Sequence, residues 1–401
     1  PPSARALRFG RAAPAAAGHH RIAGVLLIGE LALAVTLAIT GGLLARSFLA
    51  LRDLDPGFRT EHIVVAQINP PKSSYSLSPR IDALYDAILQ RAAQLPGVSS
   101  VAAVDRLPLA NPVYGVGIRI EGRFEDIRHQ LPWITHFQAI TPGYLETFGI
   151  PIQRGRAFEP ADDATGQPVA LISAAVARKY WPAGDAIGKR IGYPFPGSPW
   201  LTVVGIVPDV RVDSLRDTSS VAIYVPIAQR FGAFTTPTLS IAVRTQGEPA
   251  AVERAIPAIV RELDRTVAVS RVRTMDDVVA ASLAKSRFTT TLVAVFALVG
   301  LILGLVGVYG VMSYLVGQRM HEFGVRAALG ASSRDIMMLV LKRTAMLSAT
   351  GAAFGVLGAI LVSRSLTAFF YRVSPRDPLT FGMVALGFIA IATIASAAPA
   401  R

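Results

Sequence analysis

The feature that most constrains this chain is a set of four long apolar runs that carry almost no charge. Residues 22–45 hold one charged side chain, Glu30, and residues 288–318, 344–363 and 378–400 hold none. An α-helix needs about 20 apolar residues to cross the ~30 Å hydrocarbon core of a bilayer, and each run reaches that length. The pattern therefore predicts four membrane-spanning helices and excludes an ordinary soluble chain.

A long segment of mixed composition separates the first apolar run from the second. Residues 46–287 combine turn-forming residues with strand-like stretches, such as 62–68, and amphipathic helical stretches, such as 78–94. We therefore expect an α-helical membrane protein with four transmembrane helices and a large α+β extracytoplasmic domain inserted between helices 1 and 2. Strand–helix–strand patterns at both ends of the segment predict two α/β subdomains, one split around the other.

The basic residues that flank the apolar runs set the expected orientation. Arginines precede the first run and occupy the short segment between the second and third runs, and such residues stay on the cytoplasmic side. The predicted order is a cytoplasmic lead or linker (1–21), transmembrane helix 1 (22–45), the outer domain (46–287), transmembrane helix 2 (288–316), a cytoplasmic helix (317–335), transmembrane helix 3 (336–363), an outer loop (364–378) and transmembrane helix 4 (379–398).

The formal charge of +13 does not indicate a nucleic-acid-binding protein. Residues 46–287 hold 27 of the 40 Lys and Arg residues and 23 of the 27 Asp and Glu residues, so most of the basic excess lies beside the apolar runs. That placement orients membrane helices among lipids and does not form a phosphate-binding face. The chain has no Cys, which excludes disulfides and cysteine-based metal sites.

Two glycine pairs indicate where the helices pack against each other. Gly300 and Gly304 stand four residues apart in the second run, and Gly351 and Gly355 do so in the third. This spacing lets neighbouring backbones approach closely, although glycine is also simply frequent in membrane helices.

Glu30 is the one acid inside an apolar run. A carboxylate in the hydrocarbon is costly, and it is by default a candidate functional group. The structural alternative, which a position near the cytoplasmic end favours, is a carboxyl group that is protonated or paired with a base such as Lys342 or Arg343.

No catalytic or metal-binding pattern is complete in the sequence. Residues 184–190 resemble a phosphate-binding loop, but three residues instead of four separate the glycines, and Arg190 stands where magnesium binding requires Ser or Thr. His321-Glu322 begins like a zinc-protease helix, but Val325 occupies the position of the second His. We therefore predict no catalytic, cofactor-binding or metal site and no enzymatic activity in this chain. A membrane enzyme with an acid pair hidden in the outer segment is the least favoured alternative.

The segment between the second and third runs carries the most specific motif. Residues 318–336 read QRMHEFGVRAALGASSRDI, which resembles the cytoplasmic motif R-x-x-E-x-G-x-R-x-A-L-G-A of the FtsX-like permeases of ABC transporters. The outer segment is similar to the MacB-like periplasmic core domain at residues 55–58, 95–98, 177–182, 187–190 and 201–207. The resemblance extends through 374–381 and covers nearly the whole chain.

The resemblance implies that residues 319–331 form the coupling helix that docks on an ATPase subunit. The coupling residues are then Arg319, Glu322, Phe323, Gly324, Arg326, Leu329, Gly330 and Ala331. Glu322 and Arg326 lie four residues apart and support a short exposed helix, which leaves Phe323 and Leu329 for contact. Without the family pattern, the same loop would be interpreted as a solvated basic connector that anchors the topology.

The resemblance also implies partners and a location. We expect ATP to bind a separate ABC ATPase subunit, and we expect no cofactor on this chain. A second permease unit, supplied by a homodimer or by a fused tandem as in the duplicated permeases of acidobacteria, and a periplasmic partner complete the expected system. The expected location is the bacterial inner membrane, with the outer domain in the periplasm. The missing initial Met and the short end after the fourth run lead us to expect a partial chain.

Two functional hypotheses follow from these features. The first is the permease subunit of an ABC-type transporter, which couples ATP hydrolysis by its partner to extracytoplasmic conformational change, as mechanotransmission or export. In it, dimerisation of the ATPase moves the second and third transmembrane helices. The alternative is a membrane scaffold or sensor without a transport role, whose periplasmic domain binds a partner. That alternative predicts no ATPase partner and a dispensable cytoplasmic loop.

Overall fold

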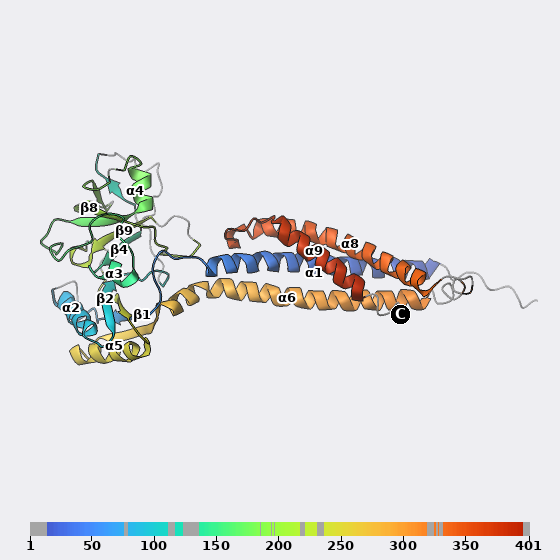
Figure 1. Ribbon diagram of the computed structural model, residues 1–401, viewed down its shortest axis with the longest axis horizontal. Coiled ribbons are helices and arrows are strands. Elements are labelled where there is room, and N and C mark those ends of the chain that lie inside the picture. The colour runs from blue at the N-terminus through green and yellow to red at the C-terminus, as the bar shows by residue number, and fades with distance from the viewer. Residues whose placement is uncertain are drawn as a thin grey trace, which may run out of the picture. The chain divides into compact units, whose positions relative to one another are not determined.

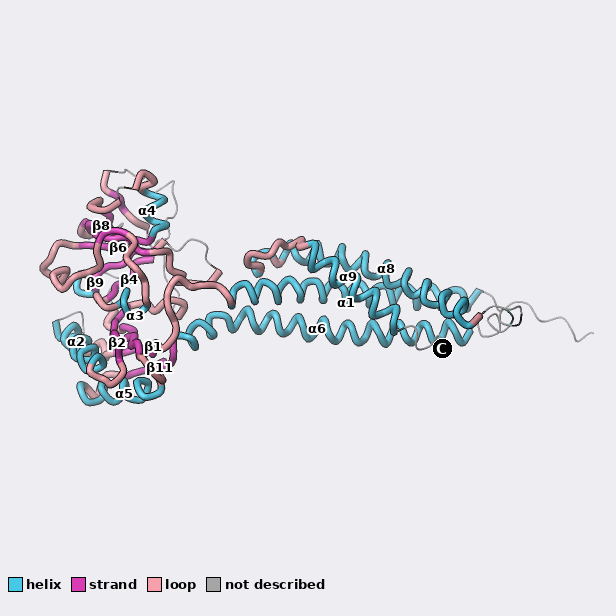
Figure 2. Tube along the Cα trace, in the orientation of Figure 1, coloured by secondary structure: helices cyan, strands magenta, loops and turns pink. Residues whose placement is uncertain are grey.

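The computed structural model in Figure 1 falls into two compact units, Pro1–Asp53 with Lys285–Arg401 and Leu54–Ala284. The structure describes residues 14–75, 79–110, 117–122, 136–184, 186–193, 195, 197–216, 221–230, 236–318, 325, 328 and 332–395. The first unit is helical, and the second contains all of the described strands (Figure 2).

Four long apolar helices pass through the first unit. They are α1 (Pro14–Arg52), α6 (Met275–Gln318), α8 (Ser333–Ser365) and α9 (Pro378–Ala395), and the 3-10 turn η3 (Thr367–Phe369) lies between the last two. Each is long and apolar enough to cross a membrane, so the described part of the chain contains four candidate spans. Three of the helices run well past their apolar cores into polar flanking residues. The 44 residues of α6 correspond to about 66 Å of helix, roughly twice the hydrocarbon thickness.

The second unit is built on one mixed sheet. The described strands lie in the order β11-β1-β10-β2-β4-β9-β6-β8-β7-β3, with β5 paired to β8 outside this path. They are β1 (Ile63–Asn69), β2 (Val98–Val104), β3 (Arg119–Ile120), β4 (His136–Ile140), β5 (Arg154–Gly155), β6 (Val169–Ser173), β7 (Arg190–Gly192), β8 (Trp200–Val207), β9 (Ala222–Pro226), β10 (Leu239–Thr245) and β11 (Ala268–Thr274). The predicted fold class, four membrane helices with an α+β domain inserted between the first two, is confirmed.

One half of the sheet packs against two amphipathic helices, α2 (Pro79–Ala93) and α5 (Ala250–Leu263). Alternate residues of a strand face opposite sides of a sheet, so one side of β1, β10 and β2 can be apolar throughout. Val64 of β1 lies on that side and shares a core with Ile88 of α2 and Ile256 of α5. Burial of the apolar stripes of α2 and α5 stabilises both helices on the sheet.

The other half of the sheet has a separate core around the short helix α4 (Ala174–Tyr180). Ser173 ends β6 and caps this helix, because its hydroxyl oxygen accepts the Val176 N–H. Phe137 of β4 stacks on Tyr193 with ring centroids 4.2 Å apart. The chain builds the first half with β1 and β2, completes the second half with β3 to β9, and returns to the first half with β10, α5 and β11.

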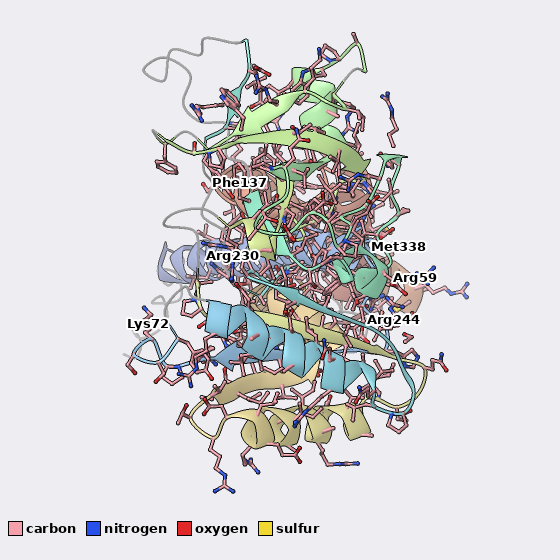
Figure 3. All side chains as sticks on the ribbon, turned by 90° about the vertical axis from the view of Figure 1, so that its left-hand side faces the viewer. Arg59, Lys72, Phe137, Arg230, Arg244 and Met338 are labelled. Carbon is pink, nitrogen blue, oxygen red and sulfur yellow. The ribbon has the colours of Figure 1, made fainter. Side chains whose placement is uncertain are left out.

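The two halves meet at a thin seam between β2 and β4, where Val104 is paired with Ile140. Asp105 follows Val104 and strengthens the seam: its N–H donates to the Ala139 carbonyl oxygen at 3.0 Å, and its carboxylate accepts the Ala139 N–H at 2.9 Å. The Asp105 side chain is only 4% exposed, and this burial raises its pKa to about 7. Arg230, labelled in Figure 3, also links the halves by donating to Asp82 of α2 at 2.8 Å.

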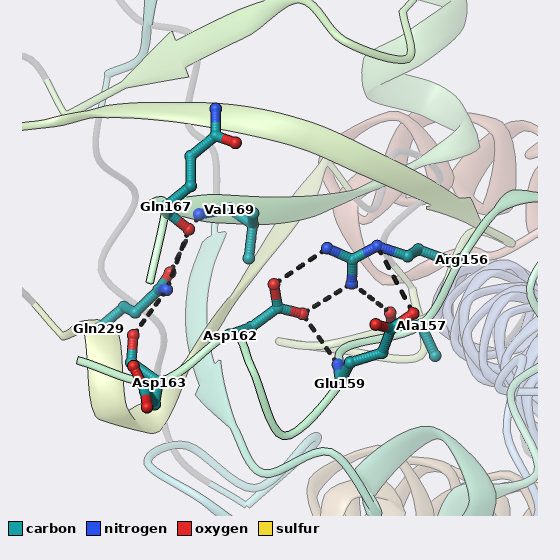
Figure 4. A network of polar contacts seen from close by, with 8 residues as sticks. All are labelled: Arg156, Ala157, Glu159, Asp162, Asp163, Gln167, Val169 and Gln229. Atoms are coloured by element: carbon teal, nitrogen blue, oxygen red, sulfur yellow. Dashed lines mark hydrogen bonds and ion pairs between the residues drawn. The ribbon is translucent and has the colours of Figure 1, made fainter. Parts of the chain in front are cut away.

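A polar network fastens the long loop between β5 and β6 (Figure 4). Arg156 donates from both terminal nitrogens to Asp162, at 2.7 and 3.0 Å, and holds the pKa of that carboxyl below its usual range. The same carboxylate accepts the Glu159 N–H at 2.8 Å. Gln229, in the turn η1 (Ile227–Gln229), accepts the N–H of Val169, where β6 begins. Gln229 also donates to the carbonyl oxygens of Asp163 and Gln167, so side chains fasten this loop to the turn after β9.

Candidate functional site in the helical unit

Helix α1 provides the core of the helical unit. Its buried apolar side chains share one cluster with residues of α6, α8 and α9: Leu27, Leu31, Ala34, Val35, Ile39 and Leu43. Helices in lipid gain little from the hydrophobic effect between them, so close packing and interhelical hydrogen bonds decide how they associate. The contacts made on α1 therefore show how closely α6 and α8 are held.

Three glycines of α6 face α1 and approach it moderately closely. A methyl group built on Gly300 would lie 3.4 Å from Ala34 Cα, and one on Gly304 would lie 3.2 Å from a methyl carbon of Leu31. Gly307 leaves room for the carboxyl group of Glu30, since a methyl group there would lie 2.6 Å from Glu30 Oε2. The first of these is an ordinary van der Waals distance, and the other two involve the ends of flexible side chains.

Three glycines of α8 approach α1 more closely, at the same four-and-three spacing. A methyl group on Gly351 would lie 2.7 Å from Leu31 Cβ, and one on Gly355 would lie 2.6 Å from Val35 Cβ and 2.8 Å from a carbonyl oxygen. One on Gly358 would lie 2.7 Å from Thr36 Oγ1. Here the obstacles are mostly Cβ and backbone atoms, which cannot swing aside. The α8 backbone therefore lies directly against α1.

The four glycines predicted for helix packing all lie at contacts with α1, two on α6 and two on α8. Sequence reasoning missed Gly307 and Gly358, which extend each pair by one turn. It also missed Thr36, whose hydroxyl donates to the Gly355 carbonyl oxygen at 3.0 Å and so joins α1 to α8. The third glycine of each helix could have been found by continuing the spacing of the first two. Nothing in the sequence, in contrast, marks Thr36 as a residue that contacts another helix.

Glu30 lies half-buried on α1 where α6 passes it at Gly307. Among the residues that the structure describes, no ion pair joins it to Lys342 or Arg343, the two bases considered as partners. The carboxyl group therefore sits at the α1–α6 contact, and its functional role stays a prediction.

The outer ends of α1 and α9 are joined by a polar network. Asp377 caps α9 by accepting from the Thr380 N–H at 2.9 Å and the Thr380 hydroxyl at 2.6 Å, and it forms an ion pair with Arg46 of α1. The Thr380 hydrogen bonds, with Arg46 adding to them, hold the pKa of Asp377 below its usual range. The Ser47 hydroxyl accepts the Tyr371 N–H at 2.8 Å. The loop before α9 is thus fastened to α1.

The predicted coupling residues lie outside the described residues. They are Arg319, Glu322, Phe323, Gly324, Arg326, Leu329, Gly330 and Ala331. The helices on either side are described: α6 ends at Gln318, and α8 begins at Ser333. In the described part of the chain, no group of three or more His, Asp or Glu side chains is placed to hold a metal ion.

The chain connects two of the membrane helices to neighbouring strands of the outer sheet. Helix α1 ends at Arg52 and leads into β1, while α6 begins at Met275, the residue after β11. Strands β1 and β11 are antiparallel neighbours, and Val64 lies opposite Thr274. The chain therefore joins α1 and α6 to one pair of hydrogen-bonded strands.

Four spans, a domain inserted after the first of them, and a short loop between the second and third define a multi-pass membrane protein with the plan of an ABC transporter permease. Comparison with protein families agrees with this plan. Residues 24–259 match the MacB-like periplasmic core domain, and residues 294–401 match the FtsX-like permease C-terminal domain. The chain belongs to the family of FtsX-like, MacB-like ABC transporter permeases, and the resemblance found in the sequence is confirmed. It is a multi-pass protein of the inner membrane with a large extracytoplasmic domain.

Curated relatives match parts of the chain at low identity. The pyoverdine export ATP-binding/permease protein PvdT of Pseudomonas putida is 28% identical over 251 residues, which cover 61% of this chain and 38% of PvdT. The macrolide export ATP-binding/permease protein MacB of Bdellovibrio bacteriovorus is 26% identical over 267 residues, 63% of this chain and 40% of MacB. The uncharacterized ABC transporter permease YknZ of Bacillus subtilis is 25% identical over 231 residues, 56% of this chain and 57% of YknZ. The matches thus cover less than two thirds of each relative.

Proposed function

We propose that this chain is the transmembrane subunit of an ABC transporter that passes ATP-driven movement of a partner to its outer domain, as mechanotransmission or export. The observation that carries the proposal is the course of α6. This helix runs without a break from Met275, beside the last residue of β11, to Gln318, beside the predicted coupling loop. A rigid element of this kind transmits a displacement at one end to the other.

In this mechanism α8 and α9 form one block with α1, and α6 moves against that block, so the second transmembrane helix moves and the third, expected from the sequence to move with it, stays fixed. The close approach of Gly351 and Gly355 and the network at Asp377 support a fixed block. The wider contacts at Gly300 and Gly304 support an α6 that can slide or rotate. Because α1 leads to β1 and α6 continues from β11, the movement is delivered to that strand pair.

The partners are part of the proposal. An ABC ATPase docks at residues 319–331 and supplies ATP binding and hydrolysis, while this chain supplies no catalytic group. The names of PvdT and MacB combine both functions in one protein, and we propose a separate ATPase for this chain. A second permease unit, as a homodimer copy or a fused tandem unit, and a periplasmic partner complete the assembly.

The proposal is tested by purifying the tagged protein from native membranes and measuring ATPase co-purification and stimulated ATP hydrolysis. The test variant is Glu322→Ala/Arg326→Ala. The matched control is Glu253→Ala/Arg254→Ala, which removes one acid and one base from α5 in the outer domain. We expect the ATPase to be retained by the wild type and by the control and to be lost from the test variant, with all three proteins inserted in the membrane.

An ATPase that is absent from all three preparations contradicts the proposal and favours a scaffold or sensor. Equal stimulation in the test and control variants contradicts the assignment of the coupling residues.

A further inference from the structure

An open pocket of about 450 Å³ lies in the outer domain, where β11 joins α6. Its lining residues come from the loop after β2, from β11 and from the first turns of α6: Leu109, Ala110, Arg271, Arg273, Val278, Ala281 and Ser282. Its volume falls within the ~300–1,000 Å³ that is usual for small-molecule sites. A separate cavity of about 10 Å³ is also lined by Ala110 and both arginines, together with residues of β1.

Arg271 and Arg273 stand two residues apart on β11 and therefore share one side of the strand, and an irregularity in β11 sets which side that is. Val65 of β1 is paired with Arg273, and Gln67 is paired with Ser270, so Arg271 and Val272 lie opposite a single residue of β1. This two-against-one count is a β-bulge, which re-aims side chains at the point where it occurs. Val272 packs against the core that β1 shares with α2 and α5, while both arginines line the pocket.

The pocket is cationic, and one buried N–H of its arginines lacks an acceptor among the described residues. None of its described lining residues is acidic. The Nε atom of Arg273 is buried and has no hydrogen-bond partner among the described residues. The nearest acids in the sequence are Asp276 and Asp277, and Asp277 accepts the Thr274 hydroxyl at 2.8 Å in a cap of α6. A buried N–H without an acceptor is unfavourable, and an anionic oxygen that reaches it would remove that cost.

The lining residues also indicate the chemical class of the ligand, which is a phosphate group attached to an apolar part. Arginine binds phosphate oxygens through two parallel N–H groups, which makes a pair of arginines well suited to a phosphate. Leu109, Val278 and Ala281 add an apolar wall beside the two guanidinium groups. Ser282 precedes Phe288, an exposed aromatic residue of the apolar run, by six residues, so the two lie within about 20 Å of each other however the units are arranged.

We propose that the Arg271–Arg273 pocket binds the phosphate group of an amphiphile, whose apolar part lies against Leu109 and Val278. The chemistry is shared by the headgroup of an anionic phospholipid of the surrounding bilayer and by a soluble alkyl phosphate. Neither residue belongs to the predicted coupling loop or to the packing face of α1, but the pocket lies at the β11–α6 junction through which the proposed movement passes. Phosphate binding is therefore measured without ATP hydrolysis, so that failure of this proposal and failure of the proposed function are distinguishable.

The absence of cysteine from the chain permits a direct binding assay. Ala280→Cys, an exposed position of α6 next to the pocket, is labelled with an environment-sensitive fluorophore in the full chain, held in phosphatidylcholine nanodiscs. One arm titrates soluble hexyl phosphate, and the other raises the fraction of phosphatidylglycerol in the disc. The test variant is Arg271→Gln/Arg273→Gln, and the matched control is Arg254→Gln/Arg261→Gln on the exposed side of α5. The labelled variants are compared after their unfolding temperatures have been shown to agree.

We expect saturable binding in at least one arm, with a half-saturating concentration that rises at least tenfold in the test variant and less than twofold in the control. Arg273→Lys, which keeps the charge and loses the planar fork, is expected to give an intermediate loss. A response to the lipid alone identifies a bilayer phospholipid, and a response to hexyl phosphate alone identifies a soluble ligand. Equal binding by test and control variants overturns the proposal, as does a wild type that responds to neither probe.

Discussion

Helices α6 and α8 present glycines to α1 with the same four-and-three spacing, yet they contact it differently. On α8, methyl groups at the glycine positions would come within 2.6–2.7 Å of Cβ or hydroxyl atoms of α1. On α6, two of the three positions leave 3.2–3.4 Å, and the third faces a flexible carboxyl group. The Thr36 hydrogen bond to Gly355 further joins α8 to α1. A glycine spacing therefore identifies which face packs, but the residues opposite decide how tightly.

The largest expected effect is a difference in unfolding free energy between a Gly→Ala substitution on α8 and one on α6. Gly355→Ala places a methyl group against Val35 Cβ and a carbonyl oxygen of α1, so we expect it to destabilise the helical unit by about 3 kcal/mol. Gly300→Ala meets Ala34 at an ordinary distance, and we expect a change within about 0.5 kcal/mol. Unfolding of both variants in mixed micelles of mild detergent and sodium dodecyl sulfate measures the difference. Equal destabilisation would remove the distinction between α6 and α8.

In the outer domain, the contact between β2 and β4 depends on Asp105, so the stability of this contact should depend on pH. The pKa of Asp105 is about 7 in the folded domain and near 4 in an unfolded chain. The folded state therefore keeps a proton that the unfolded state loses. This contribution to stability is complete below pH 4, declines as the pH rises, and is lost through pH 7.

Asp105→Asn should remove that dependence on pH, because its amide cannot ionise and its oxygen can still accept the Ala139 N–H. Relative to the variant, we expect wild-type stability to fall by about 2 kcal/mol between pH 5 and pH 7. The readout is hydrogen–deuterium exchange of the β4 amides in the full chain, corrected for intrinsic exchange rates. A wild-type-to-variant difference that stays constant over this range would show that Asp105 does not control the seam.

The smallest expected effect concerns the outer end of the α1 block. Ser47→Ala leaves the buried Tyr371 N–H without its acceptor, so we expect a loss of about 1 kcal/mol and faster exchange of the loop before α9. Ser286→Ala, an equivalent substitution on α6, is the control and should leave this loop unchanged. Unaltered exchange in Ser47→Ala would mean that other contacts, such as the Arg46–Asp377 ion pair, hold the loop.

The sequence predicted the membrane helices well because the absence of charge over about 20 residues is a local property. It predicted the extent of these helices less well. The apolar run of α6 begins near Phe288, whereas the helix begins at Met275 behind a Thr274–Asp277 cap that lies outside the run. Helical structure needs no hydrocarbon, so hydropathy alone does not mark where such a helix starts.

Pairings between distant parts of the chain could not be read from one sequence. Ile63 of β1 lies opposite Arg244 of β10, and Arg46 pairs with Asp377, in both cases across more than 150 residues without a local signal. The bulge that turns Arg271 toward the pocket depends on the register with β1 and is equally hidden. The coupling residues differ from these, because their motif is contiguous, and they stay a prediction that the described residues do not address.

The central claim, that α6 moves against a fixed α1–α8 block, is tested most directly by two cysteine pairs in this cysteine-free chain. Ala34→Cys/Gly300→Cys joins α1 to α6, and Thr36→Cys/Gly358→Cys joins α1 to α8. The Cβ positions lie 3.5 and 3.7 Å apart, which suits a disulfide in both cases. ATP hydrolysis by the co-purified ATPase is measured before oxidation, after it, and after reduction. We predict that the α1–α6 disulfide abolishes stimulated hydrolysis reversibly and that the α1–α8 disulfide preserves it. Full activity with α1 locked to α6, or equal loss with either disulfide, would contradict the account.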